Sequence, residues 1–258
     1  MTQLLDGARV VVTAGGQGIG YAITEQFRAA GARAFICDVE PARLAAAREG
    51  LPGIGTAVAD VADPAAVAAL FDAAFEYLGG IDVLVNNAGI GGLRAAVEAI
   101  DAAEWARVMA VNIGGAFHCV KQVVPRMKAQ QSGCIINIST ASVRTGLPLR
   151  TSYVTSKHGV MGLTQNLARE LGPAGIRVNA ILPGLIDNAR GRALVQRAAD
   201  EAGVSFAEAE ADALRYISMR CWIDPHEVGD VAVFLASDAA RHISGQFISV
   251  CGNAEWEE

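Results

Sequence analysis

Tyr153 and Lys157 are the two residues whose types and spacing suggest catalysis, because they stand four positions apart in a stretch that predicts a helix. Residues i and i+4 share one face of a helix, so the phenol and the ammonium group point into the same space. A phenol is a poor base at neutral pH, and a fixed cation beside it stabilises the phenolate. Such a pair can take the proton from an alcohol during oxidation or return it to an alkoxide in the reverse reaction. The spacing alone is common by chance, so its meaning depends on the elements around it.

A glycine-rich segment near the N-terminus is typical of a phosphate-binding loop. The run Ala14-Gly15-Gly16-Gln17-Gly18-Ile19-Gly20 separates a predicted strand from a predicted helix. Glycines at such a junction permit a tight turn and let the backbone approach a pyrophosphate, while the helix N-terminus offers free N–H groups. We expect Gly15, Gln17, Gly18, Ile19 and Gly20 to bind the phosphates of a dinucleotide.

Asp38 indicates which dinucleotide the loop would take. It ends the second predicted strand, 20 residues after Gly18, where a carboxylate binds the adenosine ribose hydroxyls. An NADP site needs a cation for the 2′-phosphate, which neither Gln17 nor Val39 supplies, and Asp38 would repel that phosphate. The sequence therefore predicts NAD as the cofactor, although a carboxylate here also suits a helix cap.

Two further segments would complete such a cleft. Asp60 and Val61 close the third predicted strand, where they would meet an adenine ring. The run Asn86-Asn87-Ala88-Gly89 closes the fourth, and we expect Asn87, Ala88 and Gly89 to line the cofactor at the carboxyl ends of the strands. Each short run alone also fits ordinary turn chemistry.

These residues need a parallel sheet to bring them together. Short apolar runs predict strands at 9–13, 33–38, 55–59, 81–86, 133–139, 176–182 and 246–250. Helical patterns at 19–30, 42–49, 65–77, 102–129, 153–170, 189–202 and 225–236 fill the gaps between them. Strands that alternate with helices predict an α/β protein with a doubly wound parallel sheet covered on both faces. No linker or internal repeat divides the chain, so we expect one domain over 1–258.

Composition excludes several other classes. The chain has 258 residues, 52% of them apolar, and a formal net charge of −6 without a basic run, which argues against nucleic acid or an anionic membrane as partner. No apolar stretch reaches the length of a membrane span, and Met1–Asp6 does not resemble a signal peptide. Five scattered cysteines and four scattered histidines show no metal-ligand spacing. We expect a cytoplasmic protein without a metal.

Together these motifs resemble the single-domain branch of the short-chain dehydrogenase/reductase family, over essentially the whole chain. The resemblance rests on the glycine segment, Asp38, Asp60, the Asn-Asn-Ala-Gly run, Asn112, the Tyr153/Lys157 pair and Pro183-Gly184. It implies a Rossmann-like seven-stranded sheet, an NAD(P) cofactor, and interconversion of a secondary alcohol and its ketone. It further implies that Asn112 holds a water in a proton relay through Lys157, and that Pro183, Gly184 and Ile186 orient the nicotinamide. Family members are commonly homotetramers built from long helices, here 102–129 and 153–170.

The chain departs from the family pattern in four places. Ala14 replaces the first glycine of the loop, and the catalytic serine, expected 13 residues before the tyrosine, is Thr140. Its hydroxyl can still donate to a carbonyl or alkoxide oxygen, and Ser142 is the alternative. Asn188 stands where a threonine usually contacts the nicotinamide amide. The C-terminal run 250–256 lacks the usual Asp-Gly-Gly.

The sequence leaves the substrate open. A specificity segment is expected at 187–216, and arginines are frequent there and in the loops near Tyr153. We expect Arg94 and Arg150 to bind an anionic group, whereas solvated helix faces and subunit salt bridges are the competing interpretation. An NAD-linked dehydrogenase of a polyol, sugar or hydroxy acid fits best. A reductase of a neutral ketone and a non-catalytic NAD-binding homologue are the alternatives.

Overall fold

The computed structural model describes residues 5–254, whose strands form one seven-stranded sheet in which every pair is parallel. The strands are β1 (Arg9–Thr13), β2 (Arg33–Asp38), β3 (Gly55–Val58), β4 (Val83–Asn86), β5 (Gly133–Ile138), β6 (Ile176–Pro183) and β7 (Phe247–Val250). Their order is β3-β2-β1-β4-β5-β6-β7. The chain therefore reverses direction across the sheet between β1 and β4, which is the position where doubly wound folds bind ligands.

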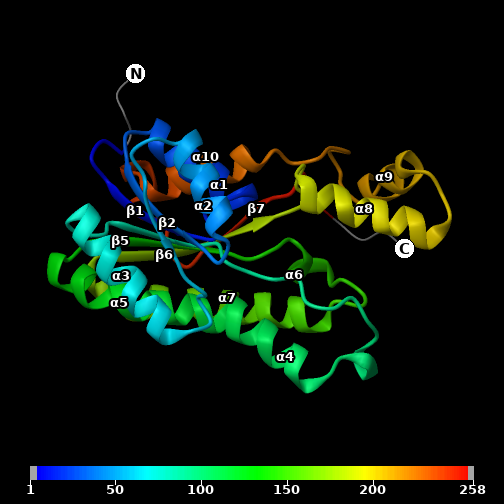
Figure 1. Cartoon of the computed structure of the whole chain (residues 1–258), viewed down its shortest axis with the longest axis horizontal. Helices are drawn as coiled ribbons and strands as arrows, with labels where there is room; N and C mark the ends of the chain where they lie inside the picture. Colours follow the sequence, from blue (N-terminus) through cyan, green and yellow to red (C-terminus); the bar gives the residue numbers. More distant parts are fainter. Residues whose placement is uncertain (1–4, 255–258) are drawn as a thin grey trace.

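Helices cover both faces of this sheet (Figure 1). One layer holds α1 (Gly18–Ala29), α2 (Pro41–Gly50) and α10 (Pro225–Ala236). The opposite layer holds α3 (Pro64–Leu78), α4 (Ala102–Met109), α5 (Gly115–Gln130) and α7 (Thr151–Leu171). The short α6 (Ser142–Thr145) precedes α7, and α8 (Ala189–Ala202) and α9 (Phe206–Leu214) extend beyond the carboxyl end of β6. This confirms the predicted α/β fold with a doubly wound, Rossmann-like sheet.

Alternation along each strand divides the core into two parts. Val10 and Val12 of β1 pack against α1, α2 and α10, whereas Val11 packs against the layer of α3, α5 and α7. Ile36 and Phe35 of β2 divide in the same way. Successive side chains of a strand point to opposite faces, so strands buried on both sides are apolar at nearly every position. The continuous apolar runs of the sequence have this physical cause.

Two predicted segments differ from the structure. The helix expected at 102–129 is interrupted by a π-helical turn at Ala110–Gly114, where the Gly115 N–H bonds to the Ala110 carbonyl. The segment 203–216, part of the expected specificity segment, was not among the predicted helices, yet it contains α9, which begins with a capping box of Ser205 and Glu208. Strand and helix ends elsewhere agree to within about two residues.

Among residues 5–254, no helix combines the length and the apolar character that crossing a bilayer requires. Met1–Leu4 and residues 255–258, which include part of the C-terminal departure from the family pattern, lie outside the described residues.

Candidate active site

The glycine loop joins β1 to α1 through a turn with little free space. Ala14 has a φ of 50°, so this alanine adopts the left-handed conformation that glycine usually supplies. The Gly15 N–H donates to the Cys37 carbonyl at the end of β2 (2.9 Å). A Cβ on Gly20 would overlap the Ala14 carbonyl oxygen and lie 2.5 Å from Asn87 Nδ2. The expected turn survives the replacement of its first glycine, and Gly20 is required for helix α1 to approach it.

The end of β4 is tied to this loop. Asn87 Nδ2 donates to the carbonyls of Thr13 (3.0 Å) and Ala14 (3.1 Å). The buried Thr13 hydroxyl accepts the backbone N–H groups of Asn87 and Ala88, both at 3.0 Å. The predicted phosphate loop and the predicted Asn-Asn-Ala-Gly lining therefore lie side by side at the carboxyl ends of the strands.

Asp38 ends β2 beside the same loop and is buried, at 4% exposure. Its Oδ1 accepts the Glu40 N–H (3.1 Å), and its Oδ2 would lie 2.9 Å from a Cβ on Gly16. Arg43, on α2, reaches Asp38 Oδ1 with Nη1 at 3.4 Å. Arg43 is a cation near Asp38 that the NAD prediction, based on Gln17 and Val39, did not include. The sequence contained one usable signal for this cation, since Arg43 lies in the first turn of the helix that follows Asp38.

Asp60 and Val61 follow β3 at the edge of the cleft. Asp60 Oδ1 accepts the Ala62 N–H (2.9 Å), and its Oδ2 pairs with Arg107 of α4 (2.8 Å). These hydrogen bonds and the Arg107 charge outweigh desolvation and lower the pKa of Asp60. Val61 is buried and would touch a Cβ on Gly115. Asp60 and Val61 form the loop that is predicted from the sequence to contact the adenine.

Lys157 lies buried on α7, one helical turn after Tyr153. Its Nζ donates to the Ile138 carbonyl at the end of β5 (2.7 Å) and would lie 3.1 Å from a Cβ on Gly89. Burial, with a smaller contribution from Arg190, lowers the pKa of Lys157 to about 8. Tyr153 is half-buried. Lys157 Nζ thus lies at the end of the sheet beside Gly89, and Tyr153 precedes it by one turn of the same helix.

Asn112 lies in the π-helical turn and anchors this region. Its Oδ1 accepts the Ile90 N–H (2.8 Å), while Nδ2 donates to the Ile90 carbonyl and to Ser156 Oγ, both at 2.9 Å. Ser156 Oγ in turn donates to the Tyr153 carbonyl (2.7 Å). Both amide hydrogens of Asn112 are therefore used to hold α7 against the loop that follows β4. Sequence reasoning missed Ser156, for which no motif gave a signal.

Thr140 and Ser142 occupy the turn after β5. The Thr140 hydroxyl donates to Ser142 Oγ at 3.3 Å, so the two candidate hydroxyls lie in contact. Thr140 is buried and Ser142 is half-buried. Ser139, the residue before them, is buried and donates to the Lys157 carbonyl (3.1 Å). Ser139 thus contacts the Tyr153/Lys157 helix directly, and the Thr140 and Ser142 hydroxyls follow it in the same turn.

The segment that follows β6 lies against the end of β7 and near the glycine loop. Gly184 donates to the Val250 carbonyl (2.9 Å) and leaves no room for a side chain, since a Cβ there would lie 2.7 Å from the Cys251 Cα. Ile186 is buried. Asn188 caps α8 by accepting the Gly191 N–H (2.9 Å), and its Nδ2 would lie 3.6 Å from a Cβ on Gly18. The Pro183–Gly184 segment and the phosphate loop therefore face each other through Asn188.

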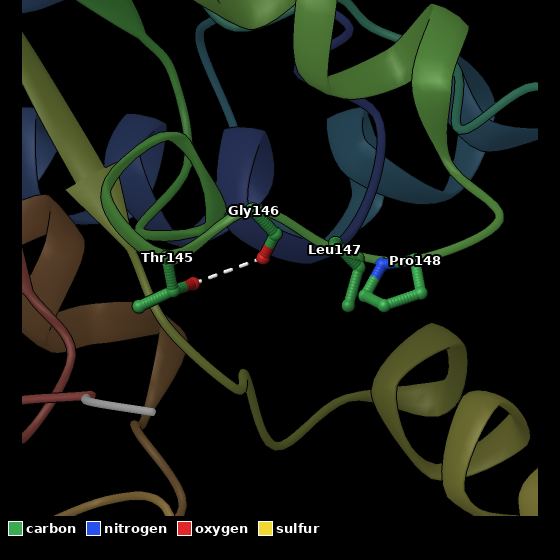
Figure 2. A pocket seen from close by; sticks show the side chains of 4 residues that line it. All are labelled: Thr145, Gly146, Leu147 and Pro148. Carbon is green, nitrogen blue, oxygen red and sulfur yellow. Dashed lines mark hydrogen bonds between the residues drawn. The ribbon is translucent and has the colours of Figure 1, made fainter. Parts of the chain in front are cut away.

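The two arginines predicted to bind substrate differ in their surroundings. Arg94 is exposed and pairs with Glu201 of α8 (2.7 Å). Arg150 is half-buried and donates through Nη1 to the carbonyls of Gly91 (3.2 Å) and Gly92 (3.1 Å). A pocket lies nearby on the loop between α6 and α7, lined by Thr145, Gly146, Leu147 and Pro148 (Figure 2).

The cleft fits a nicotinamide dinucleotide. A loop without side-chain bulk precedes α1, whose N-cap residue Gln17 makes no side-chain capping bond, so the first N–H groups of the helix remain for a phosphate. Gly16 has no room for a Cβ between Arg43 and Asp38, which leaves the Asp38 carboxylate beside bare backbone.

Comparisons with known proteins agree with this geometry. A family model described as enoyl-(acyl carrier protein) reductase matches residues 13–252. An uncharacterized oxidoreductase of Mycobacterium bovis is 37% identical over 98% of both chains. The crystal structure of levodione reductase superposes with a TM-score of 0.89 at 33% identity, covering 96% of this chain and 97% of that one.

The structure of an actinorhodin polyketide ketoreductase with NADPH also superposes, with a TM-score of 0.89 at 30% identity over 95% and 96% of the two chains. The family model, the relatives and the site geometry lead to one conclusion: the chain belongs to the short-chain dehydrogenase/reductase family of oxidoreductases, which use a nicotinamide cofactor.

Proposed function

We propose that the protein is an NAD-dependent oxidoreductase that interconverts a secondary alcohol and its ketone, with Tyr153 as acid and base. The observation that carries this proposal is the environment of Lys157. Its Nζ is buried and held by the Ile138 carbonyl at 2.7 Å, on the face of α7 that also carries Tyr153. Burial of an ammonium group costs free energy, so a buried lysine with a lowered pKa is a candidate functional residue, and beside a phenol its charge would stabilise the phenolate.

The residues that would hold the cofactor are those predicted from the sequence. Gly15, Gln17, Gly18, Ile19 and Gly20 would bind the diphosphate, and Asp38 the adenosine ribose. Asp60 and Val61 would flank the adenine, while Asn87, Ala88, Gly89, Pro183, Gly184 and Ile186 would line the path to the nicotinamide. A bound nicotinamide ring supplies the hydride acceptor or donor.

The chain itself provides the proton chemistry. The Tyr153 phenol oxygen takes the proton of the substrate hydroxyl in oxidation and returns one to the carbonyl oxygen in reduction. Lys157 stabilises the phenolate. The Thr140 hydroxyl, with Ser142 as the alternative, donates a hydrogen bond to the substrate oxygen, where negative charge develops. Asn112 keeps one Oδ1 lone pair free, with which it would hold the water that relays protons to Lys157.

Asp38 is the reason for proposing NAD over NADP. A buried carboxylate that accepts only one backbone N–H and a 3.4 Å contact from Arg43 retains lone pairs for two ribose hydroxyls. The same carboxylate repels a 2′-phosphate.

Following NADH formation tests the proposal. Purified protein is incubated with NAD+ or NADP+ and a panel of secondary alcohols, which includes polyols, sugars and hydroxy acids. We expect turnover with NAD+ that Tyr153→Phe abolishes, because a phenyl ring has no proton to exchange. Turnover that survives in Tyr153→Phe would refute the mechanism. NADH binding without turnover of any compound, also after Thr140→Ser, would favour the non-catalytic homologue.

We further propose a homotetramer built through α4, α5 and α7. Trp105 of α4 and Phe117 of α5 expose 39% and 52% of their surface, and contacts between copies of the chain through these helices would bury them. Light scattering after size exclusion should give four times the chain mass. A monomer at micromolar concentration would contradict the proposed assembly.

A further inference from the structure

Arg150 and Arg190 converge on one point of the active-site wall. A Cβ on Gly91 would lie 2.8 Å from Arg190 Nη2 and 3.2 Å from Arg150 Nη1, so the two nitrogens are within about 6 Å of each other. Arg150 precedes α7, and Arg190 is in the first turn of α8. Two elements far apart in the sequence thus direct guanidinium groups to the same place. We refer to Arg150 and Arg190 as the arginine pair.

The chain holds Arg150 in this position. Leu149 has a φ of 63°, which a leucine adopts only at a cost. Its carbonyl accepts the Ala95 N–H (3.0 Å), and the Arg150 guanidinium bonds to the carbonyls of Gly91 and Gly92. Three hydrogen bonds therefore hold the start of α7 against the loop after β4 and maintain the strained Leu149 conformation. The Arg150 guanidinium is preorganised, with donors left over for a ligand.

The charge around the arginine pair is not balanced by carboxylates. Among residues 5–254, no acidic side chain forms an ion pair with Arg150 or Arg190. Burial lowers the pKa of Arg150, and repulsion from Arg190, Arg197 and Arg94 lowers it further, opposed by Tyr153. Of these arginines, Arg94 has a partner, Glu201. These like charges repel one another although the net charge of the protein is −6, and an anion bound between them would offset that repulsion.

The arginine pair is close to the reacting groups. Gly91 is two residues from Gly89, whose Cβ position lies 3.1 Å from Lys157 Nζ, and two residues span at most about 7 Å. Tyr153 is close enough to Arg150 to raise its pKa by electrostatic interaction. A molecule with its hydroxyl at Tyr153 would therefore place an anionic group at the arginine pair a few bonds away.

We infer that the arginine pair binds the carboxylate of the substrate, which makes the substrate a short hydroxy acid or the matching keto acid. Two guanidinium groups present several parallel N–H donors, which suit a planar oxyanion. The inference rests on the proposed dehydrogenase function for the position of the hydroxyl. It assigns carboxylate binding to Arg190, which the sequence did not single out. Arg94 has a lesser role, because its guanidinium already pairs with Glu201.

A binding measurement tests the anion site without turnover. Calorimetry at constant ionic strength would compare butyrate with its neutral isostere butyramide, for the wild type and for Arg190→Gln, Arg150→Gln and Arg192→Gln. Arg192 is the matched control, since it lies on the same helix and pairs with Asp187 and Glu210. We expect Arg190→Gln to weaken butyrate binding by about 10- to 100-fold, as for loss of a charged hydrogen bond, and to leave butyramide unchanged. Arg190 is exposed, so this variant should fold even if Arg150→Gln disturbs the loop.

A kinetic measurement connects the anion site to the reaction. The substrates are 3-hydroxybutyrate and lactate, each beside its methyl ester, which has the same carbinol without the charge. We expect Arg190→Gln to raise KM for the acids by about 10-fold or more and to change KM for the esters less than about twofold. Arg192→Gln should change neither.

The outcomes separate the two proposals. Equal butyrate and butyramide binding, or acid and ester KM values that respond alike to Arg190→Gln, would overturn the anion site while dehydrogenase turnover stands. Weaker NADH binding in Arg190→Gln with unchanged butyrate binding would also overturn it, because Arg190 would then serve the cofactor. Arginine-dependent butyrate binding without turnover of any compound, also after Thr140→Ser, would support the anion site and favour the non-catalytic homologue over the proposed dehydrogenase.

Discussion

Replacing Asp38 by serine should reverse the preference between NADH and NADPH. The substitution removes the Asp38 carboxylate and leaves the Arg43 guanidinium without its partner. In the wild type the buried carboxylate faces the backbone at Gly16, with Arg43 Nη1 3.4 Å from its Oδ1. In Asp38→Ser the repulsion of a 2′-phosphate is lost. Arg43 then has no carboxylate partner and is free to reach that phosphate.

The magnitude follows from these two contacts. Two unit charges about 4 Å apart interact by about 4 kcal/mol at an effective dielectric constant near 20. Arg43 is partly exposed, so solvent screening reduces its contribution. We therefore expect the binding free energy of NADPH to improve by about 2–4 kcal/mol. The Kd of NADPH should fall by about 30- to 1000-fold. The Kd of NADH should rise by about 10-fold or more, as its ribose hydroxyls lose a charged acceptor.

Fluorescence titration with NADH and NADPH measures both constants and needs no substrate. Asp72→Ser, on the exposed face of α3, makes the same change in net charge away from the cleft and should leave both constants unchanged. The double variant Asp38→Ser/Arg43→Ala separates the two contributions, since only the loss of repulsion remains in it. A wild type that binds NADPH as tightly as NADH would refute the reasoning, because Arg43 would then already neutralise Asp38.

Three further variants test the positions of other groups. Gly20→Ala should prevent NADH binding and destabilise the fold by several kcal/mol, because its Cβ would overlap the Ala14 carbonyl oxygen. Gly162 is a helical position with open space, so the control variant Gly162→Ala should be neutral or stabilising by about 0.5–1 kcal/mol. Urea denaturation measures both effects on stability. Thr140→Val should lower kcat by about 100-fold or more and Ser142→Ala by much less, and the reverse order would assign the hydrogen bond to Ser142. Bonds to Glu25 and Asp224 (2.7 Å each) raise the pKa of His226, so its contribution to stability is complete below about pH 6.5 and is lost as pH rises through the raised value. Wild type and His226→Gln should therefore differ at pH 6 by less than about 1 kcal/mol, since the pair is exposed, and converge at alkaline pH; a difference that grows with pH would contradict this.

The sheet and the cofactor loop were predictable because local sequence determines them. Strands buried on both faces are continuous apolar runs, and the polar residues that end these runs, such as Asp38 and Asn86, lie at the carboxyl edge of the sheet whatever the details of packing. The Tyr153/Lys157 pair was predictable because helical spacing alone puts both groups on one face.

The features that the sequence did not predict depend on one-residue irregularities or on tertiary contacts. The π-turn at Ala110–Gly114 inserts a residue into a helix whose apolar pattern continues on both sides, so periodicity does not reveal it. The capping box of Ser205 and Glu208 was a usable signal for α9. The convergence of Arg150 and Arg190 had no such signal, since it depends on the left-handed backbone of Leu149 and on the position of α8 after β6.

We expect substrate binding at Arg190 to change the pKa of Lys157. Burial lowers the pKa of Lys157 to about 8, and the Arg190 charge contributes to that shift. A carboxylate bound at the arginine pair offsets the Arg190 charge, so the pKa of Lys157 should be higher with a hydroxy acid bound than with its methyl ester. If kcat requires the ammonium form, the fall in kcat at alkaline pH should begin at higher pH for the acid, and Arg190→Gln should raise the corresponding pH for the ester. Profiles of kcat against pH that coincide for acid and ester would show that the bound anion does not affect Lys157, and would place the arginine pair too far from the Lys157 ammonium group to change its pKa.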